Sequence, residues 1–176
     1  MPQNNVNSNK ITKILFVIYL FALCWILLFK LGVRFSYMAE RRVNIIPFNG
    51  LLGENGEINL GEIIMNAVVF VPPGIYVGIL YPHWTPVKKA FFFFLLSFLF
   101  EALQFIAKAG AFDITDVIAN TFGGIIGLMI MWVIEKLVSS SAKAQQFVNI
   151  LAVAGTLLMI AMLLLLKLNM LPVRYQ

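Results

Sequence analysis

Residues 90–134 read AFFFFLLSFLFEALQFIAKAGAFDITDVIANTFGGIIGLMIMWVI, in which two apolar stretches flank a polar centre. A helix needs about 20 mainly apolar residues to cross a bilayer core about 30 Å thick. The outer stretches, residues 90–107 and 114–134, match that length. The sequence therefore predicts two membrane helices joined by a short connection, with carboxylates and carboxamides gathered where the two helices meet.

The whole chain has the composition of an integral membrane protein. Of its 176 residues, 61% are hydrophobic and 12% are charged, and its mean hydropathy is +0.90. These values lie outside the usual range of water-soluble domains. The candidate membrane segments are residues 14–29, 63–80, 90–107, 114–134 and 147–166. We predict an all-α, polytopic bundle of about five transmembrane helices that forms a single membrane domain over residues 1–176.

The connection between the first two predicted helices is too long for a tight turn. Its segment VNIIPF, residues 43–48, is apolar with Pro47 inside it, and glycines follow at positions 50, 53 and 56. Glycine and proline at these spacings favour irregular backbone. We therefore predict a re-entrant or interfacial element that covers the polar centre of the bundle.

The distribution of basic residues indicates an orientation. Lys and Arg counts on the two sides nearly cancel, at six and seven. The basic N-terminal tail and the pair Lys88 and Lys89 directly flank helix ends, and they place the N-terminus in the cytoplasm. The net charge of +5 fits contact with anionic membrane lipids, and nothing about it calls for nucleic acid.

Polar residues converge on one depth from three helices. At about 1.5 Å of rise per residue, Glu101 and Gln104 lie in the last two turns of the third helix. Asp116 and Asn120 lie in the first two turns of the fourth helix, which begins on the same side. Asn66 enters from that side too, about one turn into the second helix. This convergence predicts a shallow, protein-lined polar pocket.

One stripe of the fourth helix continues from polar residues into glycines. At about 100° per residue, one third of its circumference holds Asp113, Asp116, Asn120, Gly123, Gly124 and Gly127. The spacing of Gly123 and Gly127 lets another helix approach closely, so the stripe faces protein. Asp113 fits two interpretations equally: a helix start favoured by the helix dipole, or a functional group. Glu101 lies deeper, where an ionised carboxylate costs a few kcal/mol, and it needs a partner or a role.

The second helix contains consecutive prolines. Pro72 and Pro73, in NAVVFVPPG, remove two backbone donors near the middle of the bilayer, and we expect a bend or a break there. A broken helix beside carboxylates is one way in which membrane proteins build cavities. A simple packing kink is the favoured interpretation.

Three blocks of the sequence resemble a known family. They are RRVNIIPF at residues 41–48, NAVVFVPPG at residues 66–74, and EALQ followed by FDITDVIANTFGGIIG within residues 101–127. In order and spacing they resemble the VanZ-like family, and the last block is the specific one. The resemblance implies a bacterial plasma-membrane protein, linked in some members to low-level teicoplanin resistance and without a settled biochemical activity. Members usually carry an Arg shortly before the Phe-Asp pair, where this chain has Ala109, Gly110 and Ala111.

The polar residues and the resemblance together define the candidate site. We predict that an outward-facing polar pocket binds its ligand through Arg42, Asn44, Asn66, Glu101, Gln104, Asp113, Asp116 and Asn120. No catalytic residue, metal site or cofactor is assigned. The first function hypothesis is a non-enzymatic protein that binds a lipoglycopeptide antibiotic or an envelope lipid.

Two other functions stay open. The second hypothesis is an enzyme acting on a lipid-linked substrate such as a peptidoglycan precursor, with Glu101, Asp113 and Asp116 as acid/base groups or Mg²⁺ ligands. No Ser, His or Cys nucleophile lies at that depth, which disfavours it. The third is a small transporter, disfavoured by five crossings without an internal repeat unless the protein forms a homo-oligomer.

Overall fold

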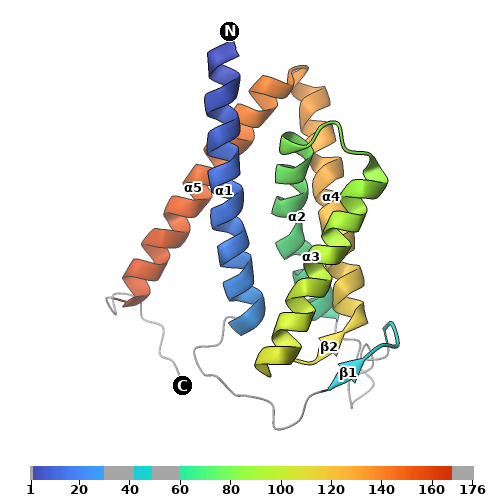
Figure 1. Ribbon diagram of the computed structural model, residues 1–176. Helices are drawn as coiled ribbons and strands as arrows, with labels where there is room; N and C mark the ends of the chain where they lie inside the picture. The colour runs from blue at the N-terminus through green and yellow to red at the C-terminus, as the bar shows by residue number, and fades with distance from the viewer. Residues whose placement is uncertain (1, 30–41, 49–59, 168–176) are drawn as a thin grey trace.

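The computed structural model describes residues 2–29, 42–48 and 60–167, which form a helical bundle (Figure 1). The helices of these ranges are α1 (Pro2–Phe29), α2 (Leu60–Leu80), α3 (Pro86–Ala107), α4 (Ile114–Val138) and α5 (Ser141–Lys167). Two short strands, β1 (Val43–Asn44) and β2 (Phe112–Asp113), lie together at one end of the bundle. The predicted all-α class is confirmed, and each predicted membrane segment lies within a helix.

Four of these helices have the length and composition of membrane-crossing segments. They are α2, α3 and α4 over their whole lengths and residues Asn7–Trp25 of α1. Helix α5 covers the fifth predicted segment but is not among these four. Its first turns carry Gln145 and Asn149, which pack against α1. The chain is therefore a helical membrane protein whose last helix begins with a polar face.

The backbones of α2 and α4 approach each other at glycines. A Cβ atom at Gly123 would overlap the carbonyl oxygen of Ala67, and one at Gly127 would overlap that of Val71. From the other side, a Cβ atom at Gly74 would overlap the carbonyl oxygen of Gly124. Helix association in lipid depends on such close van der Waals packing, because lipid tails remove the hydrophobic driving force. The prediction that the glycine stripe faces protein is confirmed.

Helix α2 continues through both prolines, so the predicted possibility of a break is wrong. Pro73 lacks the N–H that would bond to the carbonyl of Val69, four residues earlier. The Tyr19 hydroxyl of α1 donates to that carbonyl oxygen at 2.9 Å. A neighbouring helix therefore satisfies the acceptor that the proline frees, as membrane interiors require.

The end of the bundle at which the chain begins is rich in lysine, and we call it the lysine-rich end (Figure 1). Its lysines are Lys10, Lys13, Lys88, Lys89, Lys136 and Lys143. Lys88 lies 4.7 Å from the ring centroid of Trp84, and Lys136 lies 3.8 Å from that of Trp132. Aromatic and basic residues in this arrangement are typical of the interface between a membrane and water. Trp84 and Trp132 therefore mark this end of the bundle as a membrane interface.

A network of amides and hydroxyls joins α1 to α5, and the sequence did not predict it. The Thr12 hydroxyl donates to Asn149 Oδ1 at 2.9 Å and accepts from Gln145 Nε2 at 2.8 Å. Gln145 Nε2 also donates to Asn9 Oδ1 at 2.8 Å, and Asn149 Nδ2 donates to Ser8 Oγ at 3.3 Å. Such bonds between helices hold α5 against α1 near the lysine-rich end.

The glycine contact predicts a large difference between two alanine substitutions. Gly127→Ala should lower the free energy of unfolding by about 1–3 kcal/mol, because the new methyl group overlaps backbone that cannot move aside. Gly78→Ala is the control, since the atoms nearest to its Cβ belong to the side chains of Met131 and Leu128 and lie 3.2 Å or more away. Thermal unfolding in detergent measures both. Equal effects would contradict the importance of the α2–α4 contact.

The bond from Tyr19 predicts a coupling with Pro73. Tyr19→Phe should destabilise the protein by about 1 kcal/mol, because the Val69 carbonyl loses its donor. In a Pro73→Ala background, the restored N–H of residue 73 bonds to that carbonyl. Tyr19→Phe should then destabilise the protein much less. A double-mutant cycle in detergent measures the coupling. Additive effects would show that Tyr19 does not replace the missing helix bond.

Candidate functional site

Antiparallel packing of α3 on α4 places their polar residues opposite one another. In the interior, Asn120 Nδ2 donates to the Ser97 hydroxyl at 2.9 Å. One helical turn from Ser97 towards the end of α3 is Glu101, and one turn from Asn120 towards the start of α4 is Asp116. About one turn further in the same direction, Gln104 follows Glu101 on α3 and Asp113 precedes Asp116 at the start of α4. These residues form a polar ladder that descends from the bundle end into the core, and we call this end the polar end.

The segment at residues 42–48 covers the start of α4. Strands β1 and β2 pair in parallel, with Val43 opposite Phe112 and Asn44 opposite Asp113. Phe48 has a φ of 62°, in the left-handed region, and its N–H donates to the Thr115 hydroxyl at 3.0 Å. The described part of the predicted covering element therefore does lie over the polar end. The strand pair was not predicted, and residues 30–41 and 49–59 of that element lie outside the described residues.

Asp113 organises this junction. Its Oδ1 accepts from the N–H of Thr115 at 2.7 Å and caps α4, while its Oδ2 accepts from Asn44 Nδ2 at 3.0 Å. Its own N–H donates to Glu101 Oε2 at 3.2 Å. The interpretation of Asp113 as a helix start is therefore correct. One residue links β1, α3 and α4.

Glu101 is a deeply buried carboxylate, with 2% of its surface exposed. Besides accepting from the Asp113 N–H, it takes part in other interactions, as do Gln104 and Asp116. The expectation that Glu101 needs a partner in the bundle is met. Its burial beside Gln104, which is 4% exposed, keeps an ionisable and a neutral polar side chain inside an apolar fold.

Asn120 differs from its neighbours in the ladder. It is fully buried, and its Oδ1 has no hydrogen-bond partner in the described structure. An unpaired buried acceptor typically costs about 1–3 kcal/mol. Asn120 Oδ1 is therefore a buried acceptor that the described part of the fold leaves unpaired.

The other two predicted site residues lie at the margin of the ladder. Arg42 contributes its carbonyl oxygen, which accepts from the Phe112 N–H at 3.0 Å, and its side chain is exposed. Asn66 is half-buried on α2, next to the Ala67 carbonyl that lies against Gly123. The structure thus joins Asn44, Glu101 and Asp113 directly by hydrogen bonds.

Sequence reasoning missed two members of the site, Ser97 and Thr115. Both are buried and hydrogen-bonded to predicted site residues or to the covering segment. The expectation that no Ser lies at the depth of the polar residues is therefore wrong, because Ser97 accepts from Asn120. The sequence did hold a signal for it, because Ser97 is the one polar residue in the run AFFFFLLSFLF and lies one turn before Glu101. Thr115 had none, since its bond to residue 48 spans 67 positions.

The carboxylates do not form a metal centre in the described ranges. No group of three Asp, Glu, His or Cys side chains there is placed to hold a metal ion. Both oxygens of Asp113 are already used within the fold. These side chains can accept and donate hydrogen bonds at the polar end of the bundle.

Comparisons with known proteins identify relatives of this chain. The sequence profile of the VanZ/LLP1 family matches residues 16–135. The protein named Protein VanZ from Enterococcus faecium is 37% identical over 126 residues, which cover 69% of this chain and 74% of that relative. No solved structure matches the chain. The range matched by the family profile runs from α1 almost to the end of α4, so it contains the polar end and leaves α5 outside.

The two roles of Asp113 predict different effects of two substitutions. Asp113→Ala removes the α4 cap and should lower the free energy of unfolding by about 0.5–2 kcal/mol. Asp113→Asn keeps an oxygen for the Thr115 N–H but presents a donor to the Asn44 amide. It should therefore lower the free energy of unfolding clearly less than Asp113→Ala does. Thermal unfolding in detergent compares them. Equal losses would mean that the bond to Asn44, and not the cap, supplies the stability.

Proposed function

Because the chain belongs to the VanZ/LLP1 family, we propose that it is a bacterial plasma-membrane protein that contributes to teicoplanin resistance by binding a lipidic ligand at its polar end. The ligand is a lipoglycopeptide antibiotic or a lipid-linked peptidoglycan precursor. Both carry amide and hydroxyl groups next to a lipid chain, and the polar end offers acceptors at the edge of a membrane bundle.

The observation that carries this proposal is the burial of Glu101, Gln104 and Asn120 in a bundle of apolar helices. Polar side chains inside membrane segments are costly, and those that persist are usually functional. Asn120 adds an unpaired acceptor at the bottom of the ladder. Packing alone gives no reason for this acceptor, whereas a ligand donor would pair with it.

The proposed orientation places the polar end outside the cell. The lysine-rich end gathers basic residues from the starts of α1, α3 and α5 and from the last turn of α4. Basic residues near helix ends favour the cytoplasmic side. With the N-terminus inside, the polar end then faces the peptidoglycan precursors on which teicoplanin acts.

Binding without turnover is supported by the way in which the carboxylates are used. Asp113 is engaged as a helix cap and as an acceptor from Asn44, so neither oxygen is held ready for acid/base work. The competing enzyme hypothesis requires conversion of a lipid-linked precursor. Conversion of a labelled precursor by the wild type that is lost in Glu101→Gln would establish that alternative.

The proposal predicts selective protection against teicoplanin. A sensitive Gram-positive host that expresses the wild type should tolerate more teicoplanin but no more vancomycin, because the lipid chain is part of what is recognised. Asp116→Asn should lose most of this protection, since it removes a charge from the ladder at nearly constant volume. Susceptibility is measured at matched protein levels in the membrane.

Glu135→Gln is the matched control for this experiment. It removes the same charge from the same helix, at the lysine-rich end. It should protect as well as the wild type does. If Asp116→Asn also protects fully, the polar end is not the site, and if the wild type gives no protection, resistance is not the role of this chain.

A further inference from the structure

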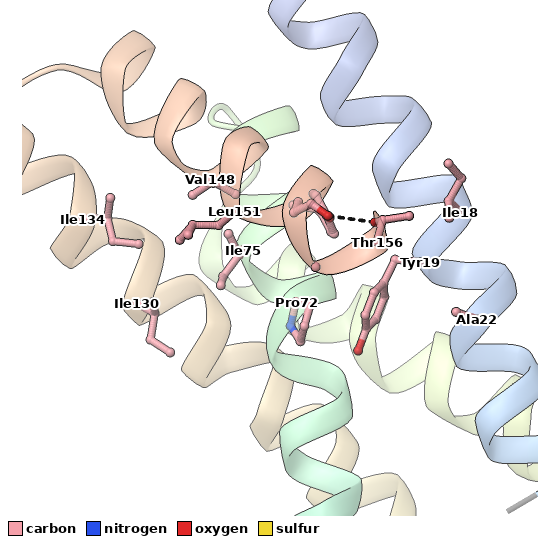
Figure 2. Close-up of a pocket in the computed structure, with 13 residues that line it drawn as sticks. Ile18, Tyr19, Ala22, Pro72, Ile75, Ile130, Ile134, Val148, Leu151 and Thr156 are labelled. Atoms are coloured by element: carbon pink, nitrogen blue, oxygen red, sulfur yellow. Dashed lines mark hydrogen bonds between the residues drawn. The ribbon is translucent and has the colours of Figure 1, made fainter. Parts of the chain in front are cut away.

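A separate apolar cavity lies between α1, α2, α4 and α5, with a volume of about 520 Å³ (Figure 2). Its walls include Ile75 of α2, Ile130 of α4 and Leu151 of α5. Ile130 and Leu151 are exposed in the structure, so the cavity opens on the outside of the bundle. The size is within the range of ligand pockets, about 300–1,000 Å³.

The polar groups in the cavity wall are already satisfied by the protein. The Tyr19 hydroxyl donates to the Val69 carbonyl at 2.9 Å, and the Thr156 hydroxyl donates to the Ala152 carbonyl at 2.8 Å (Figure 2). A bound water needs two to four polar partners, and apolar cavities without them stay dry. Hydrocarbon is therefore the occupant that this cavity fits.

Gly155 lies on the α5 wall of the cavity. A Cβ atom at Gly155 would meet no atom within 4 Å, whereas at Gly123 or Gly127 it would overlap backbone. A larger side chain at position 155 can therefore extend into the cavity without overlapping the described residues.

Charged groups near the cavity, towards the lysine-rich end, indicate the kind of lipid. Lys13 and Lys143 each lie five residues before a residue that lines the cavity, and Glu135 and Lys136 directly follow the lining residue Ile134. At about 1.5 Å per residue, all four groups are within about 8 Å of the cavity along their helices, and the basic groups outnumber the acidic one. The three lysines are exposed, and lysines at this depth attract anionic headgroups.

We propose that this cavity holds one acyl chain of an anionic phospholipid, whose phosphate lies at the lysine-rich end. The lipid fills the space between α5 and the other helices, next to the Tyr19 bond that supports α2. This site lies away from the polar end and does not depend on the function proposed for that end.

Native mass spectrometry of the purified protein tests the proposal. After incubation with phosphatidylglycerol, the wild type should retain one lipid molecule, and Gly155→Leu should retain about tenfold less because the leucine fills the cavity. Ala154→Leu is the control, since it adds the same side chain at the neighbouring exposed position and should retain the lipid. Phosphatidylcholine should bind clearly more weakly than phosphatidylglycerol to the wild type.

Two further variants keep the test decisive. Ala22→Leu narrows the same cavity from the α1 wall and should also lose the lipid, which covers a failure of Gly155→Leu to fold. Asp116→Asn should retain the lipid, so a failure at the polar end is distinguishable from a failure here. Undiminished retention in Gly155→Leu and Ala22→Leu, or equal loss in Ala154→Leu, would overturn the acyl-chain site, and equal binding of both lipids would overturn the headgroup assignment.

Discussion

The close contact between the backbones of α2 and α4 is the constraint on which the rest of the structure depends. Glycines on both helices allow it, and a methyl group at Gly74, Gly123 or Gly127 would prevent it. The other helices pack around this pair. The ring of Phe93 packs α3 against Gly124, and α1 supports α2 through the hydroxyl of Tyr19. Because lipid gives helices no hydrophobic reason to associate, such shape-dependent contacts decide how the bundle assembles.

The same face of α4 that makes this contact also carries the polar residues. Asn120 lies on this face two turns before Gly127, and Asp113 caps the start of the helix. The depth of each polar group is therefore set by the glycine contact below it and by the strand pair above it. The molecule therefore has a polar end and, at the opposite end of the bundle, a lysine-rich end. The apolar cavity opens between them, on the side of the lysine-rich end.

Hydropathy and helical spacing predict much of this arrangement because they report local properties. The five helical segments and the orientation of the glycine stripe follow from residues a few positions apart, whereas for Asp113 the sequence left a helix start and a functional group equally open. What the sequence does not reveal depends on distant partners. The sequence left a break at Pro72 and Pro73 open beside the favoured packing kink, because the compensating donor, Tyr19, lies 50 positions from Val69. The strand pair is two residues long, and the bonds from Gln145 to α1 cross more than 130 positions, so neither leaves a periodic signal.

Site-specific labelling in intact cells tests most directly whether the polar end faces outward. In a Cys24→Ala background, Ile45→Cys places a thiol on the exposed segment over the polar end, and Ser141→Cys places one at the start of α5. A membrane-impermeant maleimide should label position 45 in intact cells and position 141 only after the membrane is opened. Labelling of position 141 but not of position 45 in intact cells would place the polar end in the cytoplasm and contradict a site that meets its ligand outside the cell.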